Sequence, residues 1–144
     1  MKSVAEILRN KPNAYVYSVD IDDSLLVGLQ VMAEKGVGAL VVLSGGRLAG
    51  IVSERDYVRK VALAERSMLS AKVSEIMTRE VITVSPRDSV QHCLQLMTDR
   101  RLRHLPVVAE GELIGMLSIG DLVKQTIDDQ ASLIQQLEQY IRGG

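Results

Sequence analysis

Apolar positions along the chain predict short strands alternating with amphipathic helices. Residues 39–43 and 48–52 are apolar runs on either side of a Gly-Gly pair, which is the pattern of two strands joined by a tight turn. Before them, residues 25–35 carry apolar side chains at helical spacing and are followed by Gly36, a residue typical of helix C-termini. A further helix is expected to begin directly after Ser53.

The same pattern returns 65 positions later. Residues 24–59 align with residues 89–124 without a gap, so that the apolar positions of the helix and of both strands coincide. The match extends back to Ser18, which aligns with Thr83. Self-similarity of this length indicates two copies of one structural unit.

Each copy opens with an additional short segment. Residues 4–8 and 73–77 match at an offset of 69 and predict a short helix. The first copy therefore carries four extra residues, in the loop 10–15. A β-rich run follows, over residues 15–19 in the first copy and 81–84 in the second, so that the complete unit is β-α-β-β-α in order.

The repeat sets the fold class. A unit of this size cannot cover both faces of its small sheet, so its twin must bury what remains exposed. We expect an α/β (α+β) fold in which two repeats, residues 1–66 and 73–125, pack with pseudo-two-fold symmetry. A C-terminal helix follows over residues 126–144, and two equivalent clefts between the copies are the expected ligand sites.

The C-terminal helix carries a second pattern. Isoleucines recur every seven residues with one further position between them, in the order Val123, Ile127, Gln130, Ile134, Leu137 and Ile141. A heptad seam of about three repeats favours dimerisation through this helix. The alternative is that the seam packs on the repeats that precede it in the same chain, and the sequence pattern does not distinguish this packing from dimerisation.

Composition excludes several classes of protein. Hydrophobic residues make up 47% of the 144 residues without any Phe or Trp, so Val, Leu, Ile, Ala and Met must form the core. The net charge of -1 supplies no attraction to nucleic acid or to anionic lipid. Cys93 is the only cysteine, no apolar run is long enough to span a membrane, and no secretory signal pattern opens the chain. We therefore expect a cytoplasmic protein.

The sequence also lacks the motifs of an enzyme. Its two histidines and one cysteine form no metal-ligand spacing, and it has neither a glycine-rich phosphate loop nor a G-X-S-X-G nucleophile elbow. We expect no catalytic activity.

Several short segments occur in the same order in both copies. In the second copy they are Ile82-Thr83-Val84, His104-Leu105-Pro106-Val107, Gly111-Glu112-Leu113-Ile114-Gly115 and Ser118-Ile119-Gly120-Asp121. This order resembles the tandem CBS (cystathionine-β-synthase) domain pair, or Bateman module, over residues 4 to about 125. The resemblance implies a regulatory module that binds AMP, or another adenosine-containing ligand such as ADP, ATP, NAD or S-adenosylmethionine. It also implies a homodimer and a regulated partner protein that the sequence does not identify.

The last segment of each copy is Ser-X-X-Asp, from Ser53 to Asp56 and from Ser118 to Asp121. Helix capping alone explains a serine and an acid at this position. A carboxylate at the end of a strand can also accept both hydroxyls of a ribose. The resemblance implies this role for Asp56 and Asp121, and we favour it because both copies retain the acid.

Three further candidates come from the resemblance and from the comparison of the copies. Ser18 and Thr83 fall on the position that contacts the nucleotide in the family, although a hydroxyl bonded to the strand backbone explains Thr83 equally well. Arg55 stands in the first copy where the second has Gly120. The two ligand sites are therefore expected to differ.

A cationic cluster leads into the third predicted strand of the second copy. Arg103 and His104 offer donors for phosphate oxygens, where a run of cations is otherwise a solvated face. Leu105 and Pro106 follow, and Pro106, which has no N–H, is expected to leave neighbouring backbone groups free to bind adenine. The first copy has Gly and Ala in place of the two cations.

Two functions are compatible with these residues. The first is a nucleotide-sensing module. The alternative is a ligand-free scaffold for protein interaction and dimerisation, built on the C-terminal helix, in which both Ser-X-X-Asp segments are only helix caps.

Overall fold

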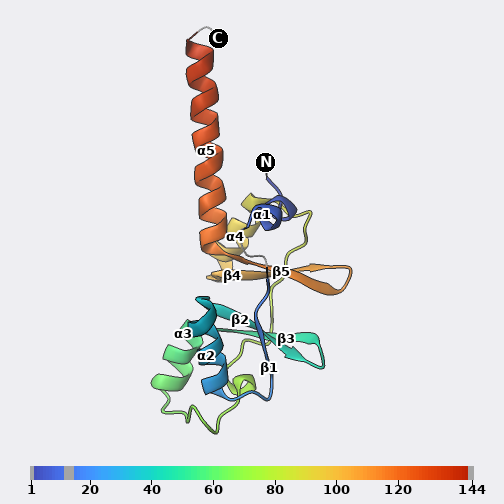
Figure 1. Ribbon diagram of the computed structural model, residues 1–144, viewed down its shortest axis with the longest axis vertical. Helices are drawn as coiled ribbons and strands as arrows, with labels where there is room; N and C mark the ends of the chain where they lie inside the picture. Colours follow the sequence, from blue (N-terminus) through green and yellow to red (C-terminus); the bar gives the residue numbers. More distant parts are fainter. Residues whose placement is uncertain (1, 12–14, 143–144) are drawn as a thin grey trace. The chain divides into compact units, whose positions relative to one another are not determined.

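A computed structural model describes residues 2–11 and 15–142 of the chain. The first copy of the repeat contains α1 (Val4–Asn10), β1 (Ser18–Asp20), α2 (Leu25–Lys35), β2 (Ala39–Ser44), β3 (Arg47–Ser53), α3 (Glu54–Asp56) and the π-helical η1 (Tyr57–Ala62). The second contains the 3-10 turn η2 (Val73–Glu75), α4 (Val90–Arg100), β4 (His104–Ala109), β5 (Glu112–Ser118) and α5 (Ile119–Ile141) (Figure 1). The mixed α/β fold expected from the repeat is confirmed.

The strands form two small sheets, of order β1-β2-β3 and β4-β5. In the first, β1 runs parallel to β2 with Val19 opposite Val42, and β2 runs antiparallel to β3. The strand expected over residues 81–84 is reduced to an isolated parallel bridge between Val84 and Val107. These two residues lie 65 positions after Val19 and Val42, so the bridge is what remains of the β1–β2 pair in the second copy.

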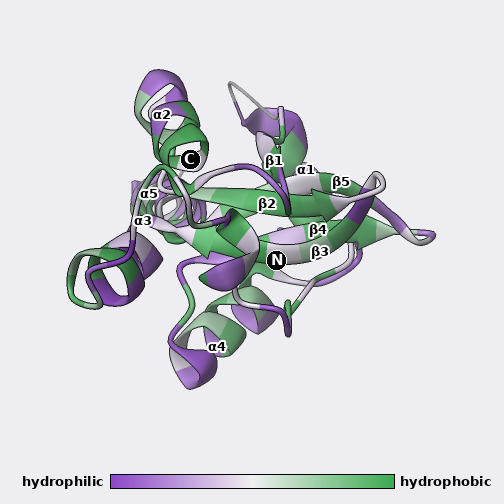
Figure 2. Ribbon diagram, turned by 90° about the horizontal axis from the view of Figure 1, so that it is seen from below, coloured by the Kyte–Doolittle hydropathy of each residue, from purple (hydrophilic) through white to green (hydrophobic). Residues whose placement is uncertain are grey.

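Serine side chains fix where the helices begin. The Oγ atoms of Ser24 and Ser89 accept hydrogen bonds from Val27 N and His92 N, and so cap the first turns of α2 and α4. The strands that follow both helices are apolar, and β2 is hydrophobic along most of its length (Figure 2). These apolar strands coincide in the two copies, and they are among the positions on which the repeat was identified in the sequence.

The contacts divide the chain into two compact units that differ from the two copies of the repeat. Unit 1 comprises residues 1–14, 84–111 and 115–144, and unit 2 comprises residues 15–83 and 112–114. The opening segment of each copy, α1 or residues 73–83, therefore belongs to the same unit as the body of the other copy.

Glycine makes this exchange possible in both units. In unit 1, a Cβ added to Gly115 would lie 2.8 Å from a methyl carbon of Leu8, which belongs to α1. In unit 2, a Cβ added to Gly50 would lie 2.7 Å from Met77 Sδ and 2.8 Å from Thr78 O. Because both distances are shorter than carbon side chains tolerate, the second hairpin strand of each unit needs glycine where the opening segment packs on it.

The buried core of each unit follows from this arrangement. In unit 2 it contains the apolar residues of α2 and of the sheet together with Val73, Ile76 and Met77 of the exchanged segment. In unit 1, Val4 and Ile7 of α1 are buried, as are Leu105, Val107, Leu117 and Leu122. Within the described residues, no helix combines the length and the apolar character that crossing a membrane requires.

The helices α2 and α4 end in the same left-handed backbone conformation with different residues. Gly36 has φ 66° after α2, and Arg101, its equivalent in the second copy, has φ 55° after α4. A side chain in this region costs about 1–2 kcal/mol, whereas glycine adopts it freely. Arg101 therefore adopts a backbone conformation that glycine would adopt at a lower cost in free energy.

We predict that Arg101→Gly stabilises the protein. The relief of backbone strain exceeds the entropy that glycine adds to the unfolded chain, which leaves a gain of about 0.5–1 kcal/mol. The melting temperature should rise by about 1–4 °C in a thermal unfolding experiment. Gly36→Ala is the matched control and should lower it, since a Cβ there meets no atom within 4 Å and only the backbone strain remains. A lower melting temperature for Arg101→Gly would contradict this account.

Candidate functional site

Each unit contains one Ser-X-X-Asp segment at the junction of a strand and a helix. In unit 2, Ser53 N donates to Asp56 Oδ2 at 2.8 Å, and Asp56 N donates to Ser53 Oγ at 3.4 Å. These reciprocal bonds form a capping box at the start of α3. Glu54 N donates to Gly38 O at 3.0 Å, which ties the junction to the residue just before β2.

A lysine completes the first of these sites. Lys60 Nζ lies 3.0 Å from Asp56 Oδ1 and donates to Ile76 O at 2.9 Å. Asp56 therefore uses Oδ2 for the cap and Oδ1 for the ion pair. Arg55, on the same turn, is half-buried.

The equivalent segment of unit 1 has the same cap and a different lysine. Ser118 N donates to Asp121 Oδ2 at 2.8 Å, and Asp121 N donates to Ser118 Oγ at 3.1 Å. Lys11 Nζ lies 2.9 Å from the same Oδ2 and donates to Met116 O at 2.8 Å. Lys11 follows α1, so the exchanged opening segment supplies the cation of this site.

The two aspartates consequently differ in what they still offer a ligand. In Asp121 both the cap and the ion pair use Oδ2. Among the residues that the structure describes, no hydrogen bond or ion pair reaches Asp121 Oδ1. A carboxylate oxygen with two uncommitted lone pairs is the acceptor that a diol requires.

Sequence reasoning did not identify Lys11. It lies at the edge of the four extra residues of the first copy, so the alignment of the repeats gives it no counterpart in the second. Lys60 was missed because it is one of three cations, with Arg55 and Arg59, on neighbouring turns, and no local pattern distinguishes it from the other two. Only the exchange of the opening segments shows that a residue near the start of the chain reaches Asp121.

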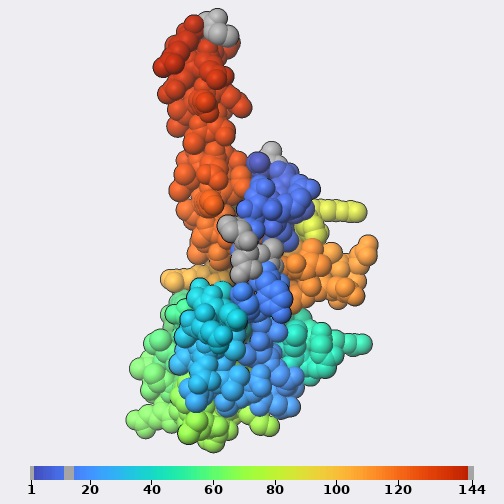
Figure 3. All heavy atoms as spheres, in the orientation of Figure 1, coloured from blue at the N-terminus to red at the C-terminus, as the bar shows by residue number. Residues whose placement is uncertain are grey.

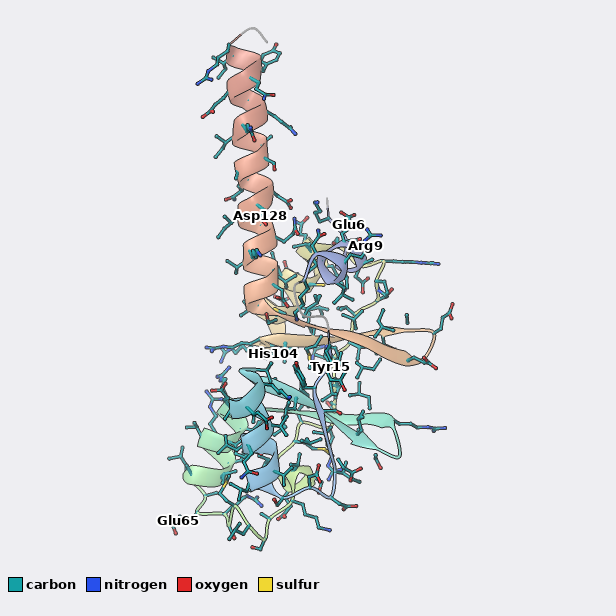
Figure 4. The ribbon with its side chains drawn as sticks, viewed as in Figure 1. Glu6, Arg9, Tyr15, Glu65, His104 and Asp128 are labelled. Atoms are coloured by element: carbon teal, nitrogen blue, oxygen red, sulfur yellow. The ribbon has the colours of Figure 1, made fainter. Side chains whose placement is uncertain are left out.

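The start of β4 brings the predicted basic residues to the site of unit 1. Ile119 N donates to Arg103 O at 2.8 Å, which holds the start of β4 beside the start of α5. The pKa of His104 is lowered from its usual 6.5, mainly by burial and then by the charge of Lys11, while Asp121 acts in the opposite direction. His104, labelled in Figure 4, therefore favours the neutral imidazole more strongly than an exposed histidine does. Arg103 is exposed, and the described part of the chain contains no ion-pair partner for it.

The remaining predicted site residues lie in different surroundings. Ser18 is exposed on β1, which is separated from β3 by β2, and Thr83 is exposed as well. Leu105 is fully buried, so its side chain belongs to the core. The carbonyl of Pro106 accepts a hydrogen bond from Val84 N at 3.0 Å, so this backbone group is already paired within unit 1.

Across residues 2–11 and 15–142, no group of three or more His, Cys, Asp or Glu side chains is placed to hold a metal ion.

Comparisons with known proteins identify the repeat. The family model for the CBS domain matches the chain twice, over residues 4–63 and 73–128. The mitochondrial CBS domain-containing protein CBSX3 of Arabidopsis thaliana is 45% identical over 128 residues, which cover 85% of this chain and 62% of that protein. The chain thus spans less than two thirds of the length of this relative.

Solved structures share the fold. A CBS-domain protein of Burkholderia ambifaria is 51% identical, with a TM-score of 0.87 over 90% of this chain and 96% of that one. The CBS pair of MJ0100, solved with 5'-methylthioadenosine and S-adenosyl-L-methionine, has a TM-score of 0.78 over 90% of this chain and 98% of that one, at 21% identity.

CBS pairs also occur inside enzymes. Inosine-5'-monophosphate dehydrogenase of Korarchaeum cryptofilum is 38% identical over 108 residues, which are 74% of this chain and only 21% of the enzyme. The matched part is therefore a small portion of that protein. With two matching segments over most of its length, this chain belongs to the CBS-domain family as a tandem pair, a module of regulatory and signal-transduction proteins.

Proposed function

We propose that this CBS pair is a non-catalytic sensor that binds an adenosine-containing nucleotide, with AMP as the preferred ligand. The observation that carries the proposal is Asp121, a carboxylate in the first turn of α5, held by the capping box with Ser118 and with Oδ1 uncommitted within the described residues. The cap at Ser118 fixes its orientation, so a ribose diol can bind without rearrangement of the carboxylate. Lys11, Arg103 and His104 supply donors for a phosphate beside it.

The site of the second repeat is proposed to bind more tightly than that of the first. Asp56 already uses both oxygens, one for the cap and one for Lys60. Gly38 and Ala39 stand where the second repeat has Arg103 and His104, so Arg55 is the remaining candidate for the phosphate. Ser18 and Ser53 stay predictions as nucleotide contacts of this weaker site.

The adenine contacts follow from the family resemblance. The backbone around Leu105 and Pro106 is the proposed contact of the base, although the carbonyl of Pro106 is bonded to Val84 N. Thr83 stays a prediction as a nucleotide contact. The MJ0100 pair binds two adenosine compounds. Because its identity to this chain is low, ADP, ATP, NAD and S-adenosylmethionine are tested beside AMP.

A homodimer and an unidentified regulated protein complete the proposal, and the cytoplasmic location stays a prediction. A ligand-free interaction scaffold is the second candidate function. It is favoured by α5, whose apolar residues from Ile127 to Ile141 are exposed. One molecule can have both functions, and a measurement of ligand binding shows whether the sensor function is present.

We predict that millimolar AMP raises the melting temperature. A ligand at 100 times its dissociation constant stabilises the folded state by about 2.7 kcal/mol. For a chain of this length the shift is about 5–10 °C. Thermal unfolding with AMP, ADP, ATP, NAD and S-adenosylmethionine gives the preferred ligand, and GMP serves as the control for the base. If no adenine nucleotide moves the transition, the scaffold function replaces the sensor.

Aspartate-to-asparagine substitutions test the ribose site. Asparagine caps a helix about as well as aspartate, so Asp121→Asn and Asp56→Asn each lose only the ion pair with Lys11 or Lys60 and should remain folded. Loss of a charged acceptor should weaken nucleotide binding at the affected site by about 1.5–3 kcal/mol, which is more than tenfold.

Calorimetric titration of each variant with the nucleotide shows which of the two sites has the higher affinity. We expect Asp121→Asn to remove the tighter binding event and Asp56→Asn to spare it. Unchanged affinity in both variants would show that these aspartates are helix caps only.

A further inference from the structure

The outer part of α5 exposes a long apolar face. The helix has 23 residues, and Leu122 and Gln125 near its start are buried in unit 1. From Ile127 onward every described residue is exposed, with Ile134 at 56% and Leu137 at 52%. In Figures 3 and 4 no other element of unit 1 lies beside the helix beyond Asp128. Large apolar side chains in this number on one free helix indicate a surface that a partner covers.

The apolar side chains form a seam along the helix that one polar residue, Gln130, interrupts. Its positions alternate in steps of four and three residues, and they are Val123, Ile127, Gln130, Ile134, Leu137 and Ile141. The buried residues Leu122 and Gln125 point to a different side of the helix, about 100° and about 160° from the mean direction of the seam at 100° per residue. The seam therefore stays accessible even where α5 packs on its own unit, since Val123 is 46% exposed.

Two edges flank the seam, and they differ in character. One edge carries Lys124, Ala131 and Glu138. The other carries Thr126, Leu133 and Tyr140, of which Leu133 is 54% exposed. In a parallel helix pair the first edge of one helix faces the second edge of the other. Neither Lys124 nor Glu138 would then meet an opposite charge, and Leu133 would lie against the carboxylate of Glu138.

An antiparallel pair resolves both problems, because each edge then faces the same edge of the other helix. Lys124 of one copy comes opposite Glu138 of the other, and the reverse pair forms at the opposite end. Leu133 meets its own counterpart on the other edge, and Ala131 meets Ala131. In the seam itself Ile127 lies opposite Leu137.

We infer that α5 is the interface with a second copy of this chain and that the two helices pair antiparallel, crossing near Ser132. Charge complementarity indicates that the partner is a second copy of this chain. Lys124 and Glu138 lie on the same edge of the seam, and in an antiparallel pair each meets the opposite charge on the other helix. The inference does not depend on nucleotide binding.

Cysteine cross-linking tests the orientation. We expect a mixture of Ile127→Cys and Leu137→Cys proteins to form a mixed disulfide dimer, while neither variant cross-links with itself. In the antiparallel pair two residues at position 127 lie ten residues apart along the axis, roughly 15 Å, which a disulfide cannot span. Cys93 does not interfere, because it is buried and burial raises the pKa of its thiol to about 11. Self-cross-linking of Ile127→Cys alone would show a parallel pair and overturn the inference.

Charge reversal tests the edge pairing in the otherwise unmodified protein. Lys124→Glu and Glu138→Lys should each weaken the dimer roughly five- to tenfold, since each places two like-charge pairs at the interface. The double variant should restore it. Gln139→Glu, on the side away from the seam, is the matched control and should leave the dimer unchanged.

Sedimentation of the unliganded protein gives the dissociation constants. Ile134→Glu should abolish the dimer, because it buries a charge at the centre of the seam. A monomeric wild type, a dimer that survives Ile134→Glu, or a double variant as weak as the single ones would each overturn the inference.

Discussion

The packing of each repeat's opening segment on the body of the other repeat is the contact on which the rest of the structure depends. Leu8 lies against Gly115 in unit 1, and Met77 lies against Gly50 in unit 2. A β-α-β-β-α unit has too little apolar surface to close a core alone, so the borrowed segment completes it. A side chain at either glycine would block this contact, which explains why both hairpins keep glycine at this position.

The same exchange makes the two candidate sites unequal. In unit 1 the borrowed segment supplies Lys11, which pairs with Asp121. In unit 2 Asp56 pairs with Lys60, four residues further along the chain, and Lys60 also donates a hydrogen bond to Ile76 O of the borrowed segment. The buried cores of the two units also differ at two equivalent positions, and the two differences compensate in volume. Unit 2 pairs Gly28 with Tyr57, whose hydroxyl donates to Leu25 O at 2.6 Å, and unit 1 has Cys93 and Leu122 at the equivalent positions. A large and a small residue have been exchanged for two of intermediate size, which conserves core volume.

The order of helices and strands and the serine caps could be predicted from the sequence, because short-range patterns determine them. Gly36 ends α2, as its position after residues 25–35 indicated, and the Ser53 cap precedes a helix as expected. The exchange could not be predicted, since an alignment of repeats shows which segments are alike and not which body each segment packs on. Lys11 was missed for that reason. The left-handed Arg101 was missed because no local signal marks an arginine for a glycine position, and the strand at Val84 shortened to a bridge although its sequence favours strand.

The stability of two fragments tests the exchange most directly. Residues 1–66 form the first repeat as the sequence delimits it, whereas residues 15–83 form nearly all of unit 2 with its borrowed segment. The account predicts that the 15–83 fragment is the more stable in urea unfolding followed by circular dichroism. It retains Val73, Ile76 and Met77 in its core, which the shorter fragment lacks. If residues 1–66 were as stable as residues 15–83, the borrowed segment would not be what closes the core, and the account would be wrong.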